Sequence, residues 1–249
     1  MSLDLESSIK FVKELENEAT LLCKLRHRNV LSFVGACLKA PTFAIVTEFI
    51  SGGSLYDVLH SKTMKKSLSM EQKLSIMFQI SLAMVYLHKK GVIHRDLKSR
   101  NVLLEPSANS QYIPKVCDFG LAKSTNTIQA ANMNNTQAVG TPLYLAPEVL
   151  LGTNYGPRCD VFSFSILMWE VLMGKIPYFD IASDLPLQMK VATDPTFRPT
   201  LPPKEISKAS PVHARYVELM IVAWSHDPEQ RPSFDKISEE FDSMIKEGQ

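Results

Sequence analysis

The spacing of hydrophobic residues changes near residue 50. Between Phe11 and Leu25 the apolar positions recur at helical intervals, and a basic cluster follows them. Val30–Leu38 and Phe43–Phe49 are short runs rich in valine, isoleucine and phenylalanine, which predicts two antiparallel strands. Ser51-Gly52-Gly53-Ser54 is a flexible break, and helical patterns dominate after it. The pattern predicts a strand-containing part over residues 1–50 and a mainly helical part over residues 51–249.

Two long helices are predicted in the second part. Ser69 and Gln72 form a capping-box pattern that opens one helix, which ends before Gly91. Asp160–Met173 is apolar on nearly every side and ends at Gly174, which predicts a buried central helix. Its apolar run is too short to cross a bilayer.

Three apolar runs between these helices are too short for helices and predict strands. They are Val92-Ile93, Val102–Leu104 and Lys115–Cys117. Ser124–Gln137 is rich in Asn, Thr, Ser and Gln, which is typical of a mobile loop. Ile181–Ala209 is rich in proline and predicts few helices.

Length, composition and charge indicate the size of the core and which partners the protein can attract. A chain of 249 residues with 45% hydrophobic content can bury one substantial core or two modest ones, and we expect two lobes that share a cleft. The net charge of +1 creates no global field toward nucleic acid or a membrane surface. The first ten residues contain no apolar signal-peptide core, so we expect a cytoplasmic protein.

The cysteines are widely spaced and form neither a CxxC pair nor a zinc pattern. They are Cys23, Cys37, Cys117 and Cys159. We expect buried thiols. Cys117 directly precedes Asp118, so a reactive thiol at the cleft stays open as an alternative.

Three motifs occur in a fixed order. His94-Arg95-Asp96-Leu97-Lys98-Ser99-Arg100-Asn101 is followed by Asp118-Phe119-Gly120 and then by Ala146-Pro147-Glu148. A lone Asp or Asn in a loop more often closes a turn, but the three motifs together form a specific signal. From about Phe11 to the last helix, the chain resembles the catalytic core of a eukaryotic protein kinase. The residues within these motifs are most similar to those of the tyrosine-kinase-like group of serine/threonine kinases, near the Raf and mixed-lineage kinases.

The resemblance implies an α+β, bilobal kinase-like fold, with a truncated β-rich N-lobe and a helical C-lobe. It also implies ATP and Mg²⁺ as cofactors and protein hydroxyls as substrates. Asp96 is then the catalytic base, Asn101 and Asp118 bind Mg²⁺, and Lys98 supports the transferred phosphoryl group. Lys98 and Thr141 favour Ser/Thr over Tyr substrates, although dual specificity stays open.

The same resemblance implies structural roles. Glu148 should form a buried pair with Arg231. Asp160 should anchor the backbone at His94 and Arg95, with a solvated helix-terminal carboxylate as the alternative. Four further positions match the hydrophobic stack that aligns in active kinases, and each is also compatible with a simple core role. They are Leu22, Phe33, His94 and Phe119.

The strand that ends near residue 50 resembles the kinase hinge. Thr47 occupies the gatekeeper position, and backbone groups of Glu48 and Ile50 would contact adenine. Ser54 fits a helix cap better than a ribose ligand.

Two phosphate-binding parts of the family are missing from the sequence. Glu18 matches the helix glutamate, but there is no GxGxxG, and Lys10 lacks the strand context of the partner lysine. We expect Lys10 to be solvated. The chain therefore starts where the third strand of the family ends. We expect one of two reasons: the start of the sequence was trimmed or wrongly assigned, or the protein is a natural kinase remnant that lacks these strands. We expect the strands to expose apolar faces and an unpaired edge, which favours weak stability and association.

Two functions from different classes follow. The first is an ATP- and Mg²⁺-dependent Ser/Thr protein kinase, and the second is a catalytically silent kinase-like interaction module. For the kinase, we expect an upstream kinase or autophosphorylation to modify the loop before Thr141. Thr136 is the favoured position, with Arg95 as the partner of the phosphate.

Overall fold

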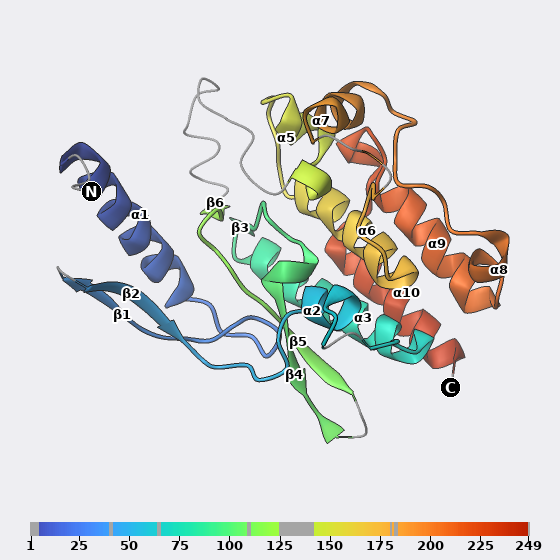
Figure 1. Ribbon diagram of the computed structural model, residues 1–249, viewed down its shortest axis with the longest axis horizontal. Helices are drawn as coiled ribbons and strands as arrows, with labels where there is room; N and C mark the ends of the chain where they lie inside the picture. The colour runs from blue at the N-terminus through green and yellow to red at the C-terminus, as the bar shows by residue number, and fades with distance from the viewer. Residues whose placement is uncertain are drawn as a thin grey trace.

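The computed structural model describes residues 5–39, 42–63, 66–108, 111–124, 142–179, 181 and 184–248. One helix and two paired strands make up the N-terminal part, and the remainder is mainly helical (Figure 1). This is the predicted α+β fold class. Among the described residues, no helix combines the length and the hydrophobicity needed to span a membrane.

The N-terminal part consists of α1 (Leu5–Leu22), β1 (Phe33–Lys39) and β2 (Thr42–Thr47). The two strands pair antiparallel as predicted, and α1 packs across them (Figure 1). The predicted bounds of the helix were wrong. It starts earlier, at Leu5, and it ends earlier, in a tight turn closed by the hydrogen bond that the Leu25 N–H donates to the Leu22 carbonyl.

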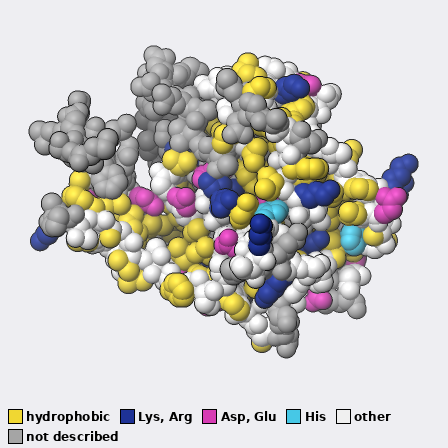
Figure 2. Space-filling model, in the orientation of Figure 1, with side chains coloured by type: hydrophobic (Ala, Val, Ile, Leu, Met, Phe, Trp, Pro, Cys, Tyr) yellow, Lys and Arg dark blue, Asp and Glu magenta, His cyan; other side chains and the backbone are white. Residues whose placement is uncertain are grey.

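The strand pair exposes apolar side chains where α1 does not cover it. Val34 is 68% exposed and Val46 is 50% exposed, while Phe49, just after β2, is 89% exposed. Figure 2 shows hydrophobic side chains over this region of the surface. Phe33 and Ile45 instead pack against the core. The predicted apolar exposure is therefore confirmed, and association through it stays a prediction.

The break after β2 leads into α2 (Leu55–His60). Ser54 caps this helix, and Asp57 completes a capping box, so the cap predicted for Ser54 is confirmed. Gly52 has no room for a side chain, because a Cβ there would lie 2.0 Å from the Leu104 carbonyl oxygen. The segment of residues 51–54 therefore packs directly against the strand Val102–Pro106, which follows the first motif.

The helical core surrounds α6 (Arg158–Met173), which is buried along nearly its whole length and ends at Gly174 with φ 60°. The other long helices are α3 (Met70–Lys89), α9 (Pro211–Ala223) and α10 (Phe234–Glu247), and Figure 1 shows them beside α6. The predicted capping box opens α3, and the inward side of this helix buries Leu74, Met77, Met84 and Leu87. α5 (Pro147–Leu150) is a short helix at the third motif.

Short strands and 3₁₀ turns carry the motifs. β3 (Val92–Ile93) pairs with β6 (Lys123–Ser124), and β4 (Val102–Pro106) pairs with β5 (Tyr112–Val116). The 3₁₀ turns are η1 (Ser99–Asn101), η3 (Pro142–Tyr144) and η4 (Pro228–Gln230).

The prediction of few helices in the proline-rich segment was wrong. This segment holds α7 (Asp184–Thr193) and α8 (Lys204–Ser207). Pro186 lies in the first turn of α7, and Pro203 directly precedes α8. Proline is tolerated at these positions because the first N–H groups of a helix have no acceptor within it.

The prediction of buried thiols holds for Cys159 and is wrong for Cys23 and Cys37, which are exposed. Cys23 follows the last residue of α1, and Cys37 lies on the same sheet face as Val46, which α1 leaves open. Cys117 is half-buried.

Candidate active site

The loop of residues 94–101, called the catalytic loop below, connects β3 to β4. Its Asp96 carboxylate accepts hydrogen bonds from Lys98 Nζ at 2.6 Å and from Asn101 Nδ2 at 2.9 Å. Asn101 Nδ2 also donates to the Asp96 carbonyl at 2.9 Å. Asp96 and Asn101 are each 5% exposed. Three of the predicted site residues therefore share one hydrogen-bonded group.

Asp160 holds the start of this loop. Its carboxylate accepts from the backbone N–H groups of His94 at 2.9 Å and Arg95 at 2.8 Å, and it lies 2.8 Å from His88 Nε2. Burial opposes ionisation of Asp160, but hydrogen bonding and charge from His88, with further help from His94 and the Arg95 N–H, lower its pKa. The alternative of a solvated carboxylate is wrong, because Asp160 is fully buried.

Backbone contacts of the preceding residue, Cys117, hold Asp118 beside the catalytic loop. The Cys117 N–H donates to the Asn101 carbonyl at 2.9 Å, and His94 Nε2 lies 3.0 Å from the Cys117 carbonyl oxygen. Asp118 has a positive φ of 63°, an uncommon conformation for a residue with a side chain, and it is exposed.

The predicted hydrophobic stack occupies connected positions. The His94 and Phe119 rings lie 5.1 Å apart, and Phe119 is 2% exposed. Leu22 belongs to the same buried cluster, and Phe33 packs against it.

Glu18 of α1 faces the second motif. Glu18 Oε2 and Asp118 Oδ1 both approach Gly120, where a Cβ would lie 3.6 Å and 3.5 Å from them. Burial and then the charge of Asp118 raise the pKa of Glu18. The side chain of Lys10 lies outside the described residues.

The predicted hinge has fixed backbone and side-chain contacts. Glu48 N–H donates to the Ser32 carbonyl, and the Glu48 carboxylate accepts from Ser32 N–H at 2.7 Å and from Lys115 Nζ at 3.0 Å. Thr47 ends β2, and Ile50 is 7% exposed. Backbone groups of Glu48 and Ile50 are the adenine contacts that the family resemblance implies, and this stays a prediction.

The third motif is joined to the far end of the chain. Arg231 donates to the two carboxylate oxygens of Glu148 at 2.7 Å and 2.9 Å, and both residues are buried. The expected pair is thus present.

Two predicted regulatory residues, Thr136 and Thr141, lie outside the described residues. Arg95, the predicted phosphate partner, donates to the Leu121 carbonyl at 2.5 Å and to the Tyr155 hydroxyl at 3.0 Å.

Sequence reasoning missed two residues that hold this site. His88 binds Asp160, and Lys115 binds Glu48. A histidine six positions before His94 and a lysine within a short apolar run were visible signals, but neither indicates its partner by spacing.

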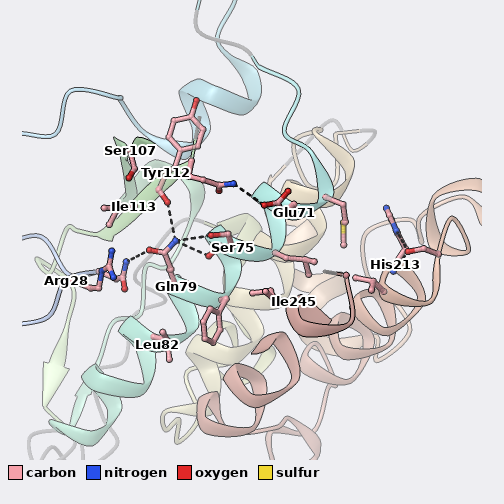
Figure 3. A pocket seen from close by; sticks show the side chains of 18 residues that line it. Arg28, Glu71, Ser75, Gln79, Leu82, Ser107, Tyr112, Ile113, His213 and Ile245 are labelled. Atoms are coloured by element: carbon pink, nitrogen blue, oxygen red, sulfur yellow. Dashed lines mark hydrogen bonds between the residues drawn. The ribbon is translucent and has the colours of Figure 1, made fainter. Parts of the chain in front are cut away.

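A cavity of about 970 Å³ lies elsewhere, between α3, β5, α9 and the end of α10. None of the predicted site residues lines it. Figure 3 shows Arg28 and His213 at its opposite ends, with Gln79 hydrogen-bonded between Ser75 and Tyr112.

Comparison with known protein families matches residues 3–241 to the family described as protein tyrosine and serine/threonine kinase. The chain belongs to this family. It is 38% identical to the Arabidopsis thaliana serine/threonine-protein kinase STY46, covering 94% of this chain and 38% of that protein. It is 35% identical to the Arabidopsis thaliana serine/threonine/tyrosine-protein kinase HT1, with 98% of this chain and 58% of HT1 covered.

The human serine/threonine-protein kinase TNNI3K is 37% identical over 88% of this chain and 25% of its own length. These relatives are kinases of the tyrosine-kinase-like group, as the motif wording predicted. The chain spans less than two fifths of the length of the first relatives that it matches.

Proposed function

We propose that this kinase domain transfers the γ-phosphoryl group of ATP to serine or threonine hydroxyls of protein substrates. The observation that carries the proposal is the Asp96 carboxylate, held between Lys98 and Asn101 at hydrogen-bond distance. Phosphoryl transfer needs little covalent work from the protein, so positioning and charge carry most of the catalysis. Asp96 orients the acceptor hydroxyl and takes its proton, while the Lys98 ammonium supports the charge of the moving group.

The residues fit Mg²⁺ by their donor chemistry. Asn101 uses its Nδ2 in two hydrogen bonds, which leaves its amide oxygen as the ligand atom, and Asp118 supplies an exposed carboxylate. Magnesium prefers such hard oxygen ligands. When bound with ATP, Mg²⁺ would neutralise phosphate oxygens.

Substitutions at the two aspartates test the assigned roles. Asp96→Asn should lower the transfer rate at least about 100-fold, because the base is lost. Its affinity for Mg-ATP should stay near the wild-type value. Asp118→Asn should weaken Mg-ATP binding in calorimetry. Asp242→Asn, on the exposed surface of α10, is the control for loss of a carboxylate. Equal loss of Mg-ATP affinity at both positions would contradict these roles.

A silent interaction module is the second candidate. The sequence contains no GxGxxG motif. Among the described residues, Glu18 approaches Asp118 and Gly120, and not the lysine with which the family pairs this glutamate. A thermal shift with Mg-ATP separates the two functions. Ligand at about 100 times its Kd adds roughly 2.7 kcal/mol, which is about 5–10 °C for a domain of this size. No shift at millimolar Mg-ATP, together with no labelling of a basic protein substrate, favours the silent module.

A further inference from the structure

Glu170 is a buried carboxylate that the proposed chemistry does not use. It lies on α6 and is 0% exposed. Its Oε1 accepts from Ser99 Oγ at 2.7 Å and lies 2.8 Å from His60 Nε2, and its Oε2 accepts from the Tyr144 hydroxyl at 2.7 Å. A carboxylate is retained in an apolar interior only when such partners replace its hydration.

The three partners come from three separate segments. Ser99 begins η1, the turn that directly follows Lys98 and ends at Asn101. Tyr144 ends η3, directly before Leu145 and the third motif, and its carbonyl accepts from Ser163 of α6 at 2.8 Å. His60 is the last residue of α2. One carboxylate therefore joins the catalytic loop to the η3 segment and to α2.

The Tyr144 hydroxyl keeps its proton and remains a hydrogen-bond donor to Glu170. Burial and then the negative charge of Glu170 raise its pKa well above the ordinary value. The phenol thus stays protonated at neutral pH and keeps its hydrogen bond to the carboxylate. Ser99 is also fully buried, so water does not compete for its hydroxyl.

We propose that Glu170 is a positioning residue, which keeps the η1 turn of the catalytic loop in register with the η3 segment through Ser99 and Tyr144. The inference rests on the proposed phosphoryl transfer for its consequence, because Lys98 directly precedes the η1 turn and Asn101 ends it. Displacement of a positioned group by about 1 Å can cost about 100-fold in rate. A fixed turn therefore matters more for the rate than for nucleotide binding.

Three variants break the cluster at different places. Ser99→Ala removes the anchor of the catalytic loop, and Tyr144→Phe removes the anchor of η3. Glu170→Gln keeps the shape but presents an amide N–H₂ group to hydroxyl or imidazole donors. The matched controls are Ser165→Ala and Tyr216→Phe. Both remove a hydroxyl that is buried in or against α6 and that, within the described part of the chain, is bonded only to a backbone carbonyl.

Steady-state kinetics provide the first readout. Ser99→Ala and Tyr144→Phe should each lower kcat at least about tenfold, with a smaller change in the KM for Mg-ATP. The double variant should lose less than the product of the two single losses, because both act through Glu170. Changes no larger than those of the controls, at equal loss of thermal stability, would overturn the proposal.

Amide hydrogen exchange provides a readout that does not need activity. Tyr144→Phe should accelerate exchange in residues 97–101 as well as in residues 142–146, and Glu170→Gln should accelerate both. Tyr216→Phe should leave both segments protected. Acceleration by Tyr144→Phe confined to its own segment overturns the inference, whether or not the chain transfers phosphate. Coupled exchange without transfer would retain the inference about position and reject the proposed function for this chain.

Discussion

Arg231 and Glu148 are 83 residues apart in sequence and form two parallel hydrogen bonds at 2.7 Å and 2.9 Å in the helical core. The Arg231 side chain is 0% exposed and that of Glu148 is 10% exposed. Arg231 also donates to the carbonyls of Ser225 and His226, so it joins the third motif to the turn before α10.

Breaking this pair should destabilise the protein strongly. Glu148→Gln leaves the buried guanidinium without its counter-charge, so the free energy of unfolding should fall by about 3–5 kcal/mol in urea denaturation. Lys246→Gln breaks an exposed pair with Asp242 and should cost less than about 1 kcal/mol. Equal losses for the two variants would show that burial of the first pair is not decisive.

Asp160 should make stability depend on acid pH. Its folded-state pKa is lowered, so its contribution is present above the unfolded pKa, near about 3.9, and is lost as the pH falls through the lowered value. Unfolding free energies measured between pH 7 and pH 2 should therefore decline below about pH 4. Asp160→Asn should be less stable at neutral pH and should show a weaker decline. An unchanged acid profile in this variant would contradict the prediction.

Glu18 should have the opposite effect. Its folded-state pKa is raised, first by burial and then by Asp118, so its ionisation opposes folding as the pH rises above the unfolded value. Glu18→Gln should raise the unfolding temperature at pH 7 and leave it nearly unchanged at about pH 4. Glu16→Gln, at an exposed position on the same helix, serves as the control. A gain of equal size at both pH values would exclude the ionisation of Glu18 as its cause.

The cysteines should divide into two reactive and two protected thiols. Cys23 and Cys37 are exposed and should react quickly with a disulfide reagent in the folded protein at pH 8. Burial, followed by the charge of Asp118, raises the pKa of Cys117 to about 12, and Cys159 is fully buried with a raised pKa. Guanidinium should release all four thiols. Rapid reaction of Cys117 in the native state would restore the reactive-thiol alternative.

The open face of the strand pair should promote association. Val46→Thr and Phe49→Ser reduce the apolar area there, so both should shift sedimentation toward the monomer at micromolar concentration. Leu151→Ser changes another exposed apolar residue, 52% exposed and outside the strand pair, and should have little effect. Association that persists unchanged in both variants would place the contact elsewhere.

Local patterns in the sequence were sufficient for several elements. The capping boxes at Ser54 and Ser69 lie within one helical turn, so their residues meet wherever the helix forms. The apolar run of α6 required burial, and Gly174 ended it. The order of the three motifs identified the family, and it predicted that Asp96 and Asn101 belong to one site.

Other features depended on packing between distant segments. Glu48 meets Lys115, and Glu170 meets Ser99 and His60, only after the helices and strands are assembled. Cys37 is exposed because α1 covers only one face of the strand pair, and Cys23 is exposed in the turn that follows α1. Residue type and local spacing determine which elements form, but burial and partners far along the chain depend on which faces of these elements pack together. The sequence by itself determined the family and its motif residues, and the tertiary structure decided which of the buried charged groups share partners.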